Sequence, residues 1–393
     1  MINLIDLVIV AAFVIGMANG FQRGFWLSLA QYVGLLVGVL AGATAAKPVL
    51  DYLQISNSTA RPLGAVLVLV IGGSLGSSLG FAAGEPIRRR ILHQGVHTST
   101  DSIAGAVLSG LAVLGMCWFL GLSFSQGPSV QIAQQIQRSV VLRALDSVAP
   151  RPPGFLASAQ AVLSGVQFPP VFAGLEPTLP SPLPIPTAVN TTGVNQAKQS
   201  VVKVSSLGCG GLVTGSGFPI GTGYIVTSAH VVSGTTAHTV ITPGGKQLKA
   251  TVVFFDSERD VAVLYVPDLT APGLPLGTAT RGTQAAVIGY PGGGPEKVVP
   301  AVVDGAINAQ GRDIYNQGLV TRQIFVIQAG VHPGNSGGPL VDLQGRVLGI
   351  VFATSASDPN QAYALTDDEI APDISYAQSN PQPQDTGQFA CAA

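Results

Sequence analysis

The sequence predicts a chain in two parts: an amino-terminal domain of four transmembrane helices, then an all-β domain of two small barrels with a short C-terminal helix. Three observations support this prediction. Hydrophobic residues make up 47% of the 393 residues and charged residues only 10%, whereas ordinary soluble domains carry roughly 25% charged residues. The apolar excess lies in the first third of the chain. The last part contains many short β-type runs separated by turn residues.

Four apolar segments lie in the first third, at residues 4–17, 25–46, 63–83 and 103–124. The last three are each long enough to cross about 30 Å of hydrocarbon as helices. The first segment is short and contains Asp6. No basic residue precedes it, which argues against a signal peptide, so we interpret it as the first membrane crossing.

Basic residues in the connecting loops predict the orientation of these segments. The first and third loops carry Arg23, Arg88, Arg89 and Arg90, whereas the middle loop carries Lys47 and Arg61. Because basic residues accumulate on the cytoplasmic side, both termini are expected outside the cytoplasmic (inner) membrane. Everything after the fourth segment would then lie in the periplasm.

Glycine recurs at every fourth residue in the second and third segments. This spacing places the glycines on one helix face, where another helix can approach closely. The predicted helix–helix association uses Gly34, Gly38, Gly42, Gly72, Gly76, Gly80 and Gly84. No pair of intramembrane charges marks a transport path, so this part is expected to act as an anchor or packing module.

The predicted domain boundaries are a membrane domain at 1–126, an extracytoplasmic linker at 127–190 and the β domain at 191–393. The first part of the linker shows helical spacing of apolar residues. From about residue 149 prolines dominate, and proline fixes φ and removes a backbone donor. We therefore expect that part to be extended rather than packed. Near the C-terminus, Thr366 and Glu369 form a capping-box pattern that predicts the short helix.

The hexapeptide G-N-S-G-G-P at residues 334–339 places Ser336 between glycines. A sharp turn of this kind exposes a hydroxyl beside bare backbone N–H groups, which suits a nucleophile next to an oxyanion hole. Taken alone, the hexapeptide is equally consistent with a Gly-rich turn. A catalytic interpretation requires a base and a carboxylate elsewhere in the chain.

His230 is the best candidate for the base, since it closes T-S-A-H directly after a predicted strand at residues 224–227. His238 and His332 have no comparable framework, although His332 is close to Ser336 in sequence. The strand end would hold the ring of His230 in a fixed place.

Asp260 is the best candidate for the carboxylate that orients this base, because it opens D-V-A-V-L at the start of another strand. Asp256 lies in a turn-like D-S-E-R stretch that is expected to be exposed, and Asp268 follows a proline at the far end of the strand.

The motifs G-S-G-F, G-Y-I-V-T-S-A-H-V-V, R-D-V-A-V-L and H-P-G-N-S-G-G-P-L resemble the chymotrypsin-fold serine proteases, in the branch shared with HtrA-type bacterial proteases. The order His, Asp, Ser is that of the chymotrypsin family. With four amino-terminal crossings, a Pro-rich spacer and two flanking cysteines, the chain resembles the MarP-type membrane-anchored acid-resistance serine proteases of mycobacteria. The four crossings resemble the colicin V production family.

This resemblance implies a serine endopeptidase with a chymotrypsin-like double β-barrel and no metal or other cofactor. Ser336 would attack the scissile carbonyl, His230 would move the proton and Asp260 would fix the ring. Backbone N–H groups of Gly334, Asn335 and Ser336 would form the oxyanion hole. Asn335 stands where digestive proteases have Asp, so their activation through a freed amino terminus is not expected here.

The first substrate pocket (S1) is expected to be uncharged. Trypsins keep an acidic residue six positions before the nucleophile, and that position is Gly330 here. The strand expected to wall the pocket contributes Phe352, Ala353 and Thr354.

Cys209 and Cys391 bracket the β domain, and Cys117 lies within an apolar segment. A disulfide between the first two would persist in an oxidising compartment, which agrees with the predicted orientation; the alternative is two free thiols. The resemblance suggests cell-envelope proteins, including cell-wall hydrolases, as substrates during acid or oxidative stress.

Two other functions are consistent with the same sequence. A binding or sensing module would keep the barrels and lose turnover. Alternatively, the membrane part would be the functional one, as a transporter or secretion factor regulated by the protease. The net charge of -1 gives no reason to expect a nucleic-acid partner.

Overall fold

The computed structural model describes residues 3–54, 60–92, 98–125, 129–149, 171–177 and 181–392. Most of the Pro-rich part of the predicted linker, at 150–170 and 178–180, lies outside them. The chain forms two compact units, residues 1–165 and residues 166–393. We describe each unit by itself.

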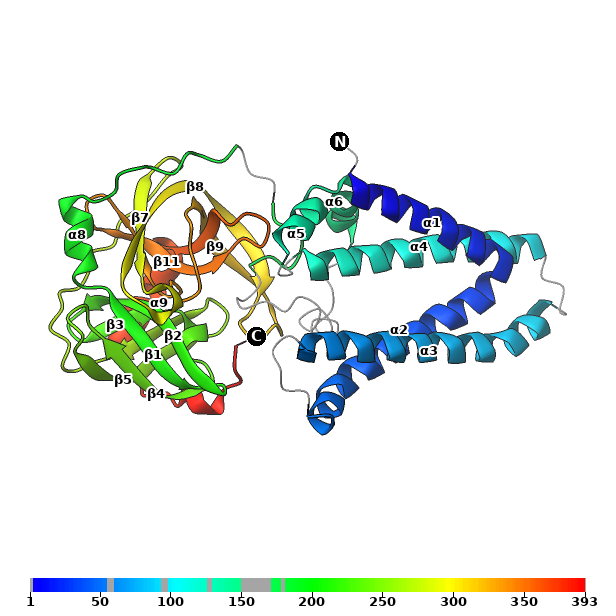
Figure 1. Ribbon diagram of the computed structural model, residues 1–393, viewed down its shortest axis with the longest axis horizontal. Coiled ribbons are helices and arrows are strands. Elements are labelled where there is room, and N and C mark those ends of the chain that lie inside the picture. Colours follow the sequence, from blue (N-terminus) through cyan, green and yellow to red (C-terminus); the bar gives the residue numbers. More distant parts are fainter. Residues whose placement is uncertain are drawn as a thin grey trace. The chain divides into compact units, whose positions relative to one another are not determined.

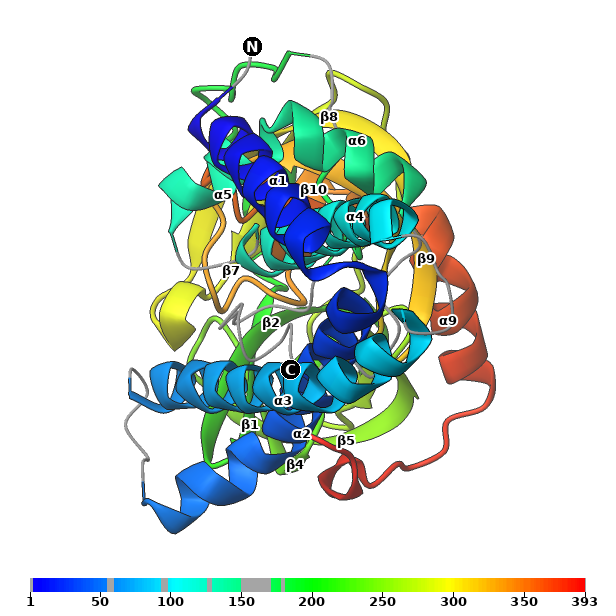
Figure 2. The same ribbon diagram turned by 90° about the vertical axis from the view of Figure 1, so that its right-hand side faces the viewer.

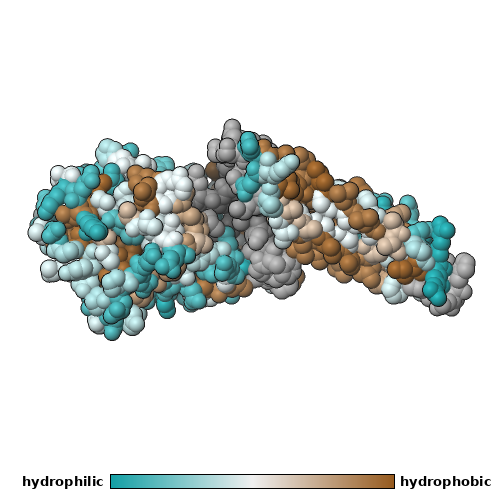
Figure 3. Space-filling view, turned by 90° about the horizontal axis from the view of Figure 1, so that it is seen from below, coloured by the Kyte–Doolittle hydropathy of each residue, from teal (hydrophilic) through white to brown (hydrophobic). Residues whose placement is uncertain are grey.

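The first unit is helical, and four of its helices are long and apolar enough to cross a membrane, as the sequence predicts. They are α1 (Leu4–Arg23), α2 (Phe25–Tyr52), α3 (Ala60–Leu92) and α4 (Thr98–Phe124). Apolar residues cover much of their surface (Figure 3). Two short helices follow, α5 (Val130–Gln137) and α6 (Val140–Val148), where the sequence shows helical spacing.

The helices pack in two pairs, α2 with α3 and α1 with α4 (Figure 1 and Figure 2). The predicted glycine faces form the contact between α2 and α3. A Cβ at Gly38 would overlap the carbonyl oxygen of Gly72, and one at Gly76 would overlap that of Gly34. The missing side chains therefore let the two backbones approach closely.

The acidic residue of the first crossing caps two helices. Asp6 and Asn3 form a capping box at the start of α1. The Asp6 carboxylate also accepts hydrogen bonds from Ser139 Oγ at 2.6 Å and from the N–H of Val141 at 3.1 Å, at the start of α6. A carboxylate at a helix amino terminus is favourable because it meets unpaired N–H groups and the positive end of the dipole.

The second unit contains two closed six-stranded barrels, which confirms the predicted all-β double barrel. The first barrel has the strand order β1-β2-β3-β6-β5-β4. Its strands are β1 (Val202–Gly208), β2 (Gly211–Gly221), β3 (Tyr224–Thr227), β4 (Thr235–Ile241), β5 (Gln247–Asp256) and β6 (Val261–Tyr265). All neighbouring strands are antiparallel, and closure leaves no unpaired sheet edge.

The second barrel has the order β10-β11-β12-β9-β8-β7. Its strands are β7 (Gln284–Gly289), β8 (Lys297–Arg312), β9 (Leu319–Gln328), β10 (Pro339–Asp342), β11 (Val347–Thr354) and β12 (Gln361–Thr366). Small helices complete the unit: α8 (Thr192–Lys198), η1 (Ala229–Val231), η2 (Pro291–Gly293), α9 (Asp367–Ser379) and η3 (Thr386–Gln388).

Helix α9 begins where the capping pattern predicts. Thr366 Oγ1 accepts from the N–H of Glu369 at 3.2 Å. The Glu369 side chain, however, accepts from the N–H of Gln323 at 3.0 Å and does not return to the cap. The helix is thereby tied to β9.

One part of the predicted linker is packed, contrary to the expectation of an extended spacer. Residues 171–175 are buried, and Val171 and Phe172 belong to the hydrophobic core of the second unit. Prolines are absent from this short stretch, so its apolar side chains are free to fill the core.

Candidate active site

His230 lies at the end of β3, on the short helix η1, as expected for a ring held at a strand end. Its Nδ1 is 2.7 Å from Asp260 Oδ2, and its backbone N–H donates to Asp260 Oδ1 at 2.9 Å. One carboxylate thus binds both the ring and the main chain of His230. The Nδ1 proton is directed at the carboxylate, which leaves Nε2 as the basic nitrogen.

Asp260 is fully buried and has a φ of 64°, a left-handed conformation that Asp adopts more readily than most residues. The turn that carries it is stabilised by Asp256, whose Oδ1 accepts from the N–H groups of Glu258 and Arg259 at 2.7 and 3.0 Å. Buried Arg322 donates from Nε to the carbonyl of Glu258 at 2.5 Å. Sequence reasoning missed Arg322, because the carbonyl of Glu258 that it binds lies 64 positions away.

The charge of Arg322 also acts on this carboxylate. Burial lowers the pKa of the Arg322 guanidinium, and the nearby carboxylates of Asp260 and Asp256 oppose that effect. The Arg322 guanidinium lies over the ring of Phe352, 6.0 Å from its centroid. The guanidinium and the Asp260 carboxylate are therefore close enough to interact electrostatically.

Ser336 lies on a turn that only glycine permits at two positions. Gly334 and Gly337 have φ values of 96° and 81°. A Cβ at Gly337 would overlap Thr227 Oγ1 and come within 2.8 Å of the backbone nitrogen of Ser228. The Ser336 loop therefore packs against the residues that immediately precede His230. Within the described residues no hydrogen bond joins Ser336 Oγ to the ring of His230, and such bonds often tighten only when substrate binds.

Ser216 anchors this loop from the first barrel. Its N–H donates to the carbonyl of Ser336 at 2.8 Å, and its Oγ donates to the carbonyl of Gly334 at 2.7 Å. The same Oγ accepts from the N–H of Tyr290 at 2.9 Å. Ser216 is the serine of the G-S-G-F motif, so the sequence did contain a signal for it.

The backbone N–H groups of the loop are not all available to a substrate. The N–H of Asn335 donates to the carbonyl of His332 at 3.0 Å, so it is already used. The carbonyl of Pro333 accepts from the N–H of Gly292 at 2.6 Å. Because a trans peptide directs its N–H away from its carbonyl, the N–H of Gly334 points to the opposite side. In the described part of the chain, the N–H groups of Gly334 and Ser336 donate no hydrogen bond.

The four predicted pocket residues differ in exposure. A Cβ at Gly330 would meet no atom within 4 Å, so there is open space beside it. Thr354 is partly exposed at the end of β11. Phe352 and Ala353 are almost fully buried, and the Phe352 ring lies in the core beneath Arg322. The Phe352 side chain therefore belongs to the barrel core rather than to an exposed pocket wall.

The competing histidines have other partners. His238 lies on β4 between Ser206 Oγ at 3.0 Å and Thr386 Oγ1 at 3.1 Å. Its burial lowers its pKa. The N–H of His332 donates to Asn335 Oδ1 at 3.3 Å. No group of three His, Cys, Asp or Glu side chains converges as a metal site among the described residues.

Comparison with known proteins extends these observations to the whole chain. Residues 215–350 match the model of the trypsin-like peptidase domain, and residues 5–150 match that of the colicin V production protein. The serine protease Rv3671c of Mycobacterium tuberculosis is 33% identical over 401 residues, which cover 99% of this chain and 98% of the relative. The chain belongs to the Rv3671c family of serine proteases.

A solved structure of the same relative and one further relative agree with this assignment. The crystal structure of the active form of the Rv3671c protease covers 56% of this chain with 40% identity and a TM-score of 0.51, and 99% of that chain is matched. A probable periplasmic serine endoprotease of the DegP-like type from Halomonas elongata is 36% identical over 167 residues, 41% of this chain and 34% of the relative. The protein is thus a serine protease with a chymotrypsin-like fold.

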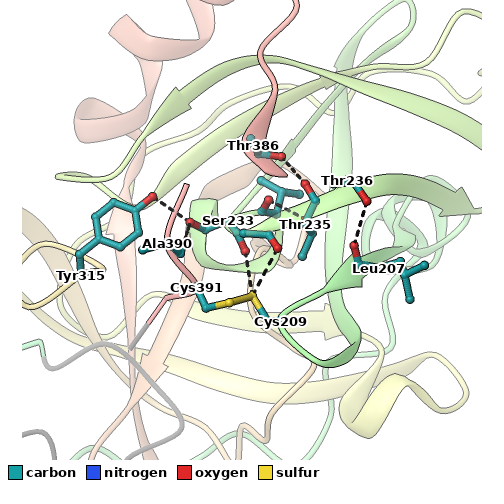
Figure 4. Close-up of a disulfide and its surroundings, with 11 residues drawn as sticks. Leu207, Cys209, Ser233, Thr235, Thr236, Tyr315, Thr386, Ala390 and Cys391 are labelled. Carbon is teal, nitrogen blue, oxygen red and sulfur yellow. Dashed lines mark hydrogen bonds between the residues drawn. A yellow bond between two sulfur atoms is a disulfide. The ribbon is translucent and has the colours of Figure 1, made fainter. Parts of the chain in front are cut away.

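The two flanking cysteines of this Rv3671c-type protease form a disulfide, as the sequence predicts (Figure 4). The Cα atoms of Cys209 and Cys391 are 5.7 Å apart, and 182 positions separate them. Hydrogen bonds hold the same C-terminal segment to the barrel: Ser233 Oγ donates to the carbonyl of Ala390 at 2.8 Å, and Thr386 Oγ1 donates to the carbonyl of Thr235 at 2.9 Å. The segment from Thr386 to Cys391 is therefore held against the first barrel.

Proposed function

We propose that this serine protease is a membrane-tethered endopeptidase that uses a Ser336–His230–Asp260 triad outside the cytoplasm. The observation that carries this proposal is the pair of hydrogen bonds that the buried Asp260 carboxylate accepts from His230, next to a glycine turn that presents Ser336. A buried, doubly bound carboxylate orients a base, and the base then has one free nitrogen for a hydroxyl.

In the proposed reaction Ser336 Oγ attacks the scissile carbonyl and His230 Nε2 takes its proton. Collapse of the tetrahedral intermediate breaks the C–N bond, and the protonated ring gives that proton to the leaving amine. Water then attacks the acyl-enzyme, again with His230 as base, and releases the second product. Asp260 keeps the Nδ1 proton in place and stabilises the imidazolium.

The oxyanion of the intermediate would be bound by the N–H groups of Gly334 and Ser336. These two groups lack partners among the described residues. Asn335, which the sequence predicts as a third oxyanion-hole donor, does not contribute, because its N–H donates to the carbonyl of His332 within the turn. Each such donor is worth about 3 kcal/mol of transition-state stabilisation.

The positions of the basic residues and the disulfide support the proposed extracytoplasmic location. Four basic residues, Arg23 at the end of α1 and Arg88, Arg89 and Arg90 near the end of α3, flank the α1–α2 and α3–α4 connections, which favours a cytoplasmic position for these connections. A structural disulfide between Cys209 and Cys391 suits an oxidising compartment. A protease held at that surface would meet proteins of the cell envelope, including cell-wall hydrolases. We propose these as its substrates during acid or oxidative stress.

The triad is tested on the full chain in detergent. We expect a fluorophosphonate probe to label the wild type, and Ser336→Ala to lose both labelling and the cleavage of unfolded casein, with a fall of at least about 10⁴-fold in turnover. Ser379→Ala, at an exposed position on α9, is the matched control and should retain both. Labelling of Ser336→Ala at the wild-type rate would exclude Ser336 as the nucleophile, and an unlabelled wild type would favour a binding module.

A further inference from the structure

The stretch Val171–Glu176, which we call the upstream segment, precedes both barrels in sequence but packs into the second one. Its Phe172 ring meets the ring of buried Tyr363 edge to face, with centroids 5.4 Å apart. The N–H of Ala173 donates to the carbonyl of Gln310 on β8 at 2.8 Å. An aromatic contact and a main-chain hydrogen bond therefore fix the position of this segment on the barrel.

The upstream segment ends in a carboxylate that binds one loop. Glu176 Oε2 accepts from Ser355 Oγ at 2.8 Å and from Ser357 Oγ at 2.9 Å, and Oε1 accepts from the N–H of Ala356 at 3.3 Å. Hydrogen bonds to an ionised acceptor are stronger than those between neutral groups. Three consecutive residues of the loop are thus gathered around one half-buried side chain from about 180 positions away.

This loop, Ser355–Asn360, joins β11 to β12, and we call it the recognition loop. It begins directly after Thr354, and its last carbonyl, that of Asn360, accepts from the N–H of Ala329 at 2.6 Å. Ala329 directly precedes Gly330. The recognition loop therefore runs from Thr354 to the neighbour of Gly330, two positions predicted to line the first substrate pocket.

The Glu176 carboxylate also lies close to the buried hydroxyl of Tyr363. Burial and the Glu176 carboxylate together raise the pKa of the Tyr363 hydroxyl well above its ordinary value. The same hydroxyl accepts from Gln361 Nε2 at 2.8 Å. Glu176 is thus placed between the recognition loop and the first strand residues that follow it.

We propose that Glu176 is a positioning residue for substrate recognition, which holds the recognition loop in the shape that binds the substrate side chain before the cut. This inference rests on the proposed function of Ser336, because the loop can line a substrate pocket only if Ser336 is the nucleophile. Glu176 itself does not touch the reacting atoms. Its loss should weaken substrate binding and leave the reactivity of the serine intact.

The test uses the full chain in detergent and a fluorogenic peptide copied from a site that the wild type cuts in unfolded casein. For Glu176→Ala we expect KM to rise about tenfold, equivalent to about 1.4 kcal/mol, while kcat changes less than about threefold. Fluorophosphonate labelling should proceed at the wild-type rate, since the small probe does not need the pocket wall.

Two variants make the result specific. Glu176→Gln keeps one oxygen for the two serine hydroxyls, so its KM should return to within about threefold of the wild type. Asp268→Ala, an exposed acidic residue beyond β6, should leave KM unchanged.

An unchanged KM in Glu176→Ala overturns the proposal, and so does a parallel loss of labelling and peptide cleavage, which would indicate general damage to the fold. Failure of the wild type itself to be labelled would instead refute the proposed nucleophile, so the two proposals can fail separately.

Discussion

At the scale of single residues, the geometry around His230 depends on one carboxylate in an uncommon backbone conformation. Asp260 holds a φ of 64° at the end of a turn that Arg322 and Asp256 stabilise. The left-handed conformation aims its two oxygens at the ring and the N–H of the same histidine. The turn thus places the Asp260 carboxylate, and its two hydrogen bonds orient the His230 ring.

Replacement of Asp260 by Asn tests this arrangement. The amide offers one oxygen and one NH₂ group, so one of the two His230 donors would face another donor and the ring would take the other tautomer. We expect kcat to fall about 10⁴-fold, with a similar loss of fluorophosphonate labelling. Peptide hydrolysis measures the first and gel fluorescence the second. Asp268→Asn is the control, and an Asp260→Asn enzyme that keeps a tenth of its activity would contradict this role.

Glu296 should make the stability of the protease unit depend on pH. Burial raises the pKa of this carboxyl from its ordinary 4.5 to about 7, although Lys198 lowers it. Its Oε1 has no hydrogen-bond partner among the described residues. The folded state therefore holds the proton more tightly than the unfolded state, and the free energy of unfolding falls as pH rises from about 4.5 to about 7.

Glu296→Gln should remove that fall. We expect the variant to be more stable than the wild type by about 1–2 kcal/mol at pH 8, after allowance for partial screening by solvent. At pH 4 the two should be nearly equal, because the carboxyl is protonated in both states. Scanning calorimetry of the protease unit in the full chain measures the difference. Exposed Glu258→Gln is the control, and an equal shift at both pH values would exclude titration of Glu296 as the cause.

At the scale of elements, much of the fold follows from short-range patterns. Strand β3 was predicted at its observed bounds, Tyr224–Thr227, because turn residues flank a short β-branched run. The start of α1 at Leu4 was predicted, but its end was missed: the predicted segment ended at residue 17, whereas the helix continues to Arg23. Gly20 lies in this extension, directly against Gly105 and Ser109 of α4. Because α4 is distant in sequence, the composition of the first segment could not predict this contact or the longer helix.

The glycine contact between α2 and α3 predicts a clear contrast between two equally small substitutions. Gly76→Ala places a methyl group on the backbone of Gly34 and Gly38, so the helices must separate. We expect a loss of about 1–3 kcal/mol in the stability of the helical unit. Gly115→Ala on α4 meets nothing within 4 Å and should be neutral.

The free thiol of Cys117, partly buried in α4, reports the unfolding of this unit. The temperature at which a maleimide dye reacts with it should fall for Gly76→Ala and stay constant for Gly115→Ala. Equal temperatures for both variants would mean that close packing of α2 and α3 does not stabilise the unit.

At the scale of the whole molecule, the residues that the sequence did not predict are those whose partners are distant in sequence. Ser336, His230 and Asp260 could be predicted because each stands beside its own local signal, a glycine turn or a strand end. Arg322 and Glu176 have no such signal, since each acts through a partner that is distant in sequence. Glu176 was further obscured by the prolines around it, which indicate an extended spacer.

The orientation of the chain in the membrane yields a prediction that connects the two units. If basic loops remain in the cytoplasm, Ser99 at the start of α4 lies inside and Ser147 near the end of α6 lies outside; both are exposed. In a Cys117→Ser background we expect Ser147→Cys to react with a membrane-impermeant maleimide in intact spheroplasts. Ser99→Cys should react only after the membrane is permeabilised. The reverse pattern would place the barrels in the reducing cytoplasm, where a structural disulfide does not persist.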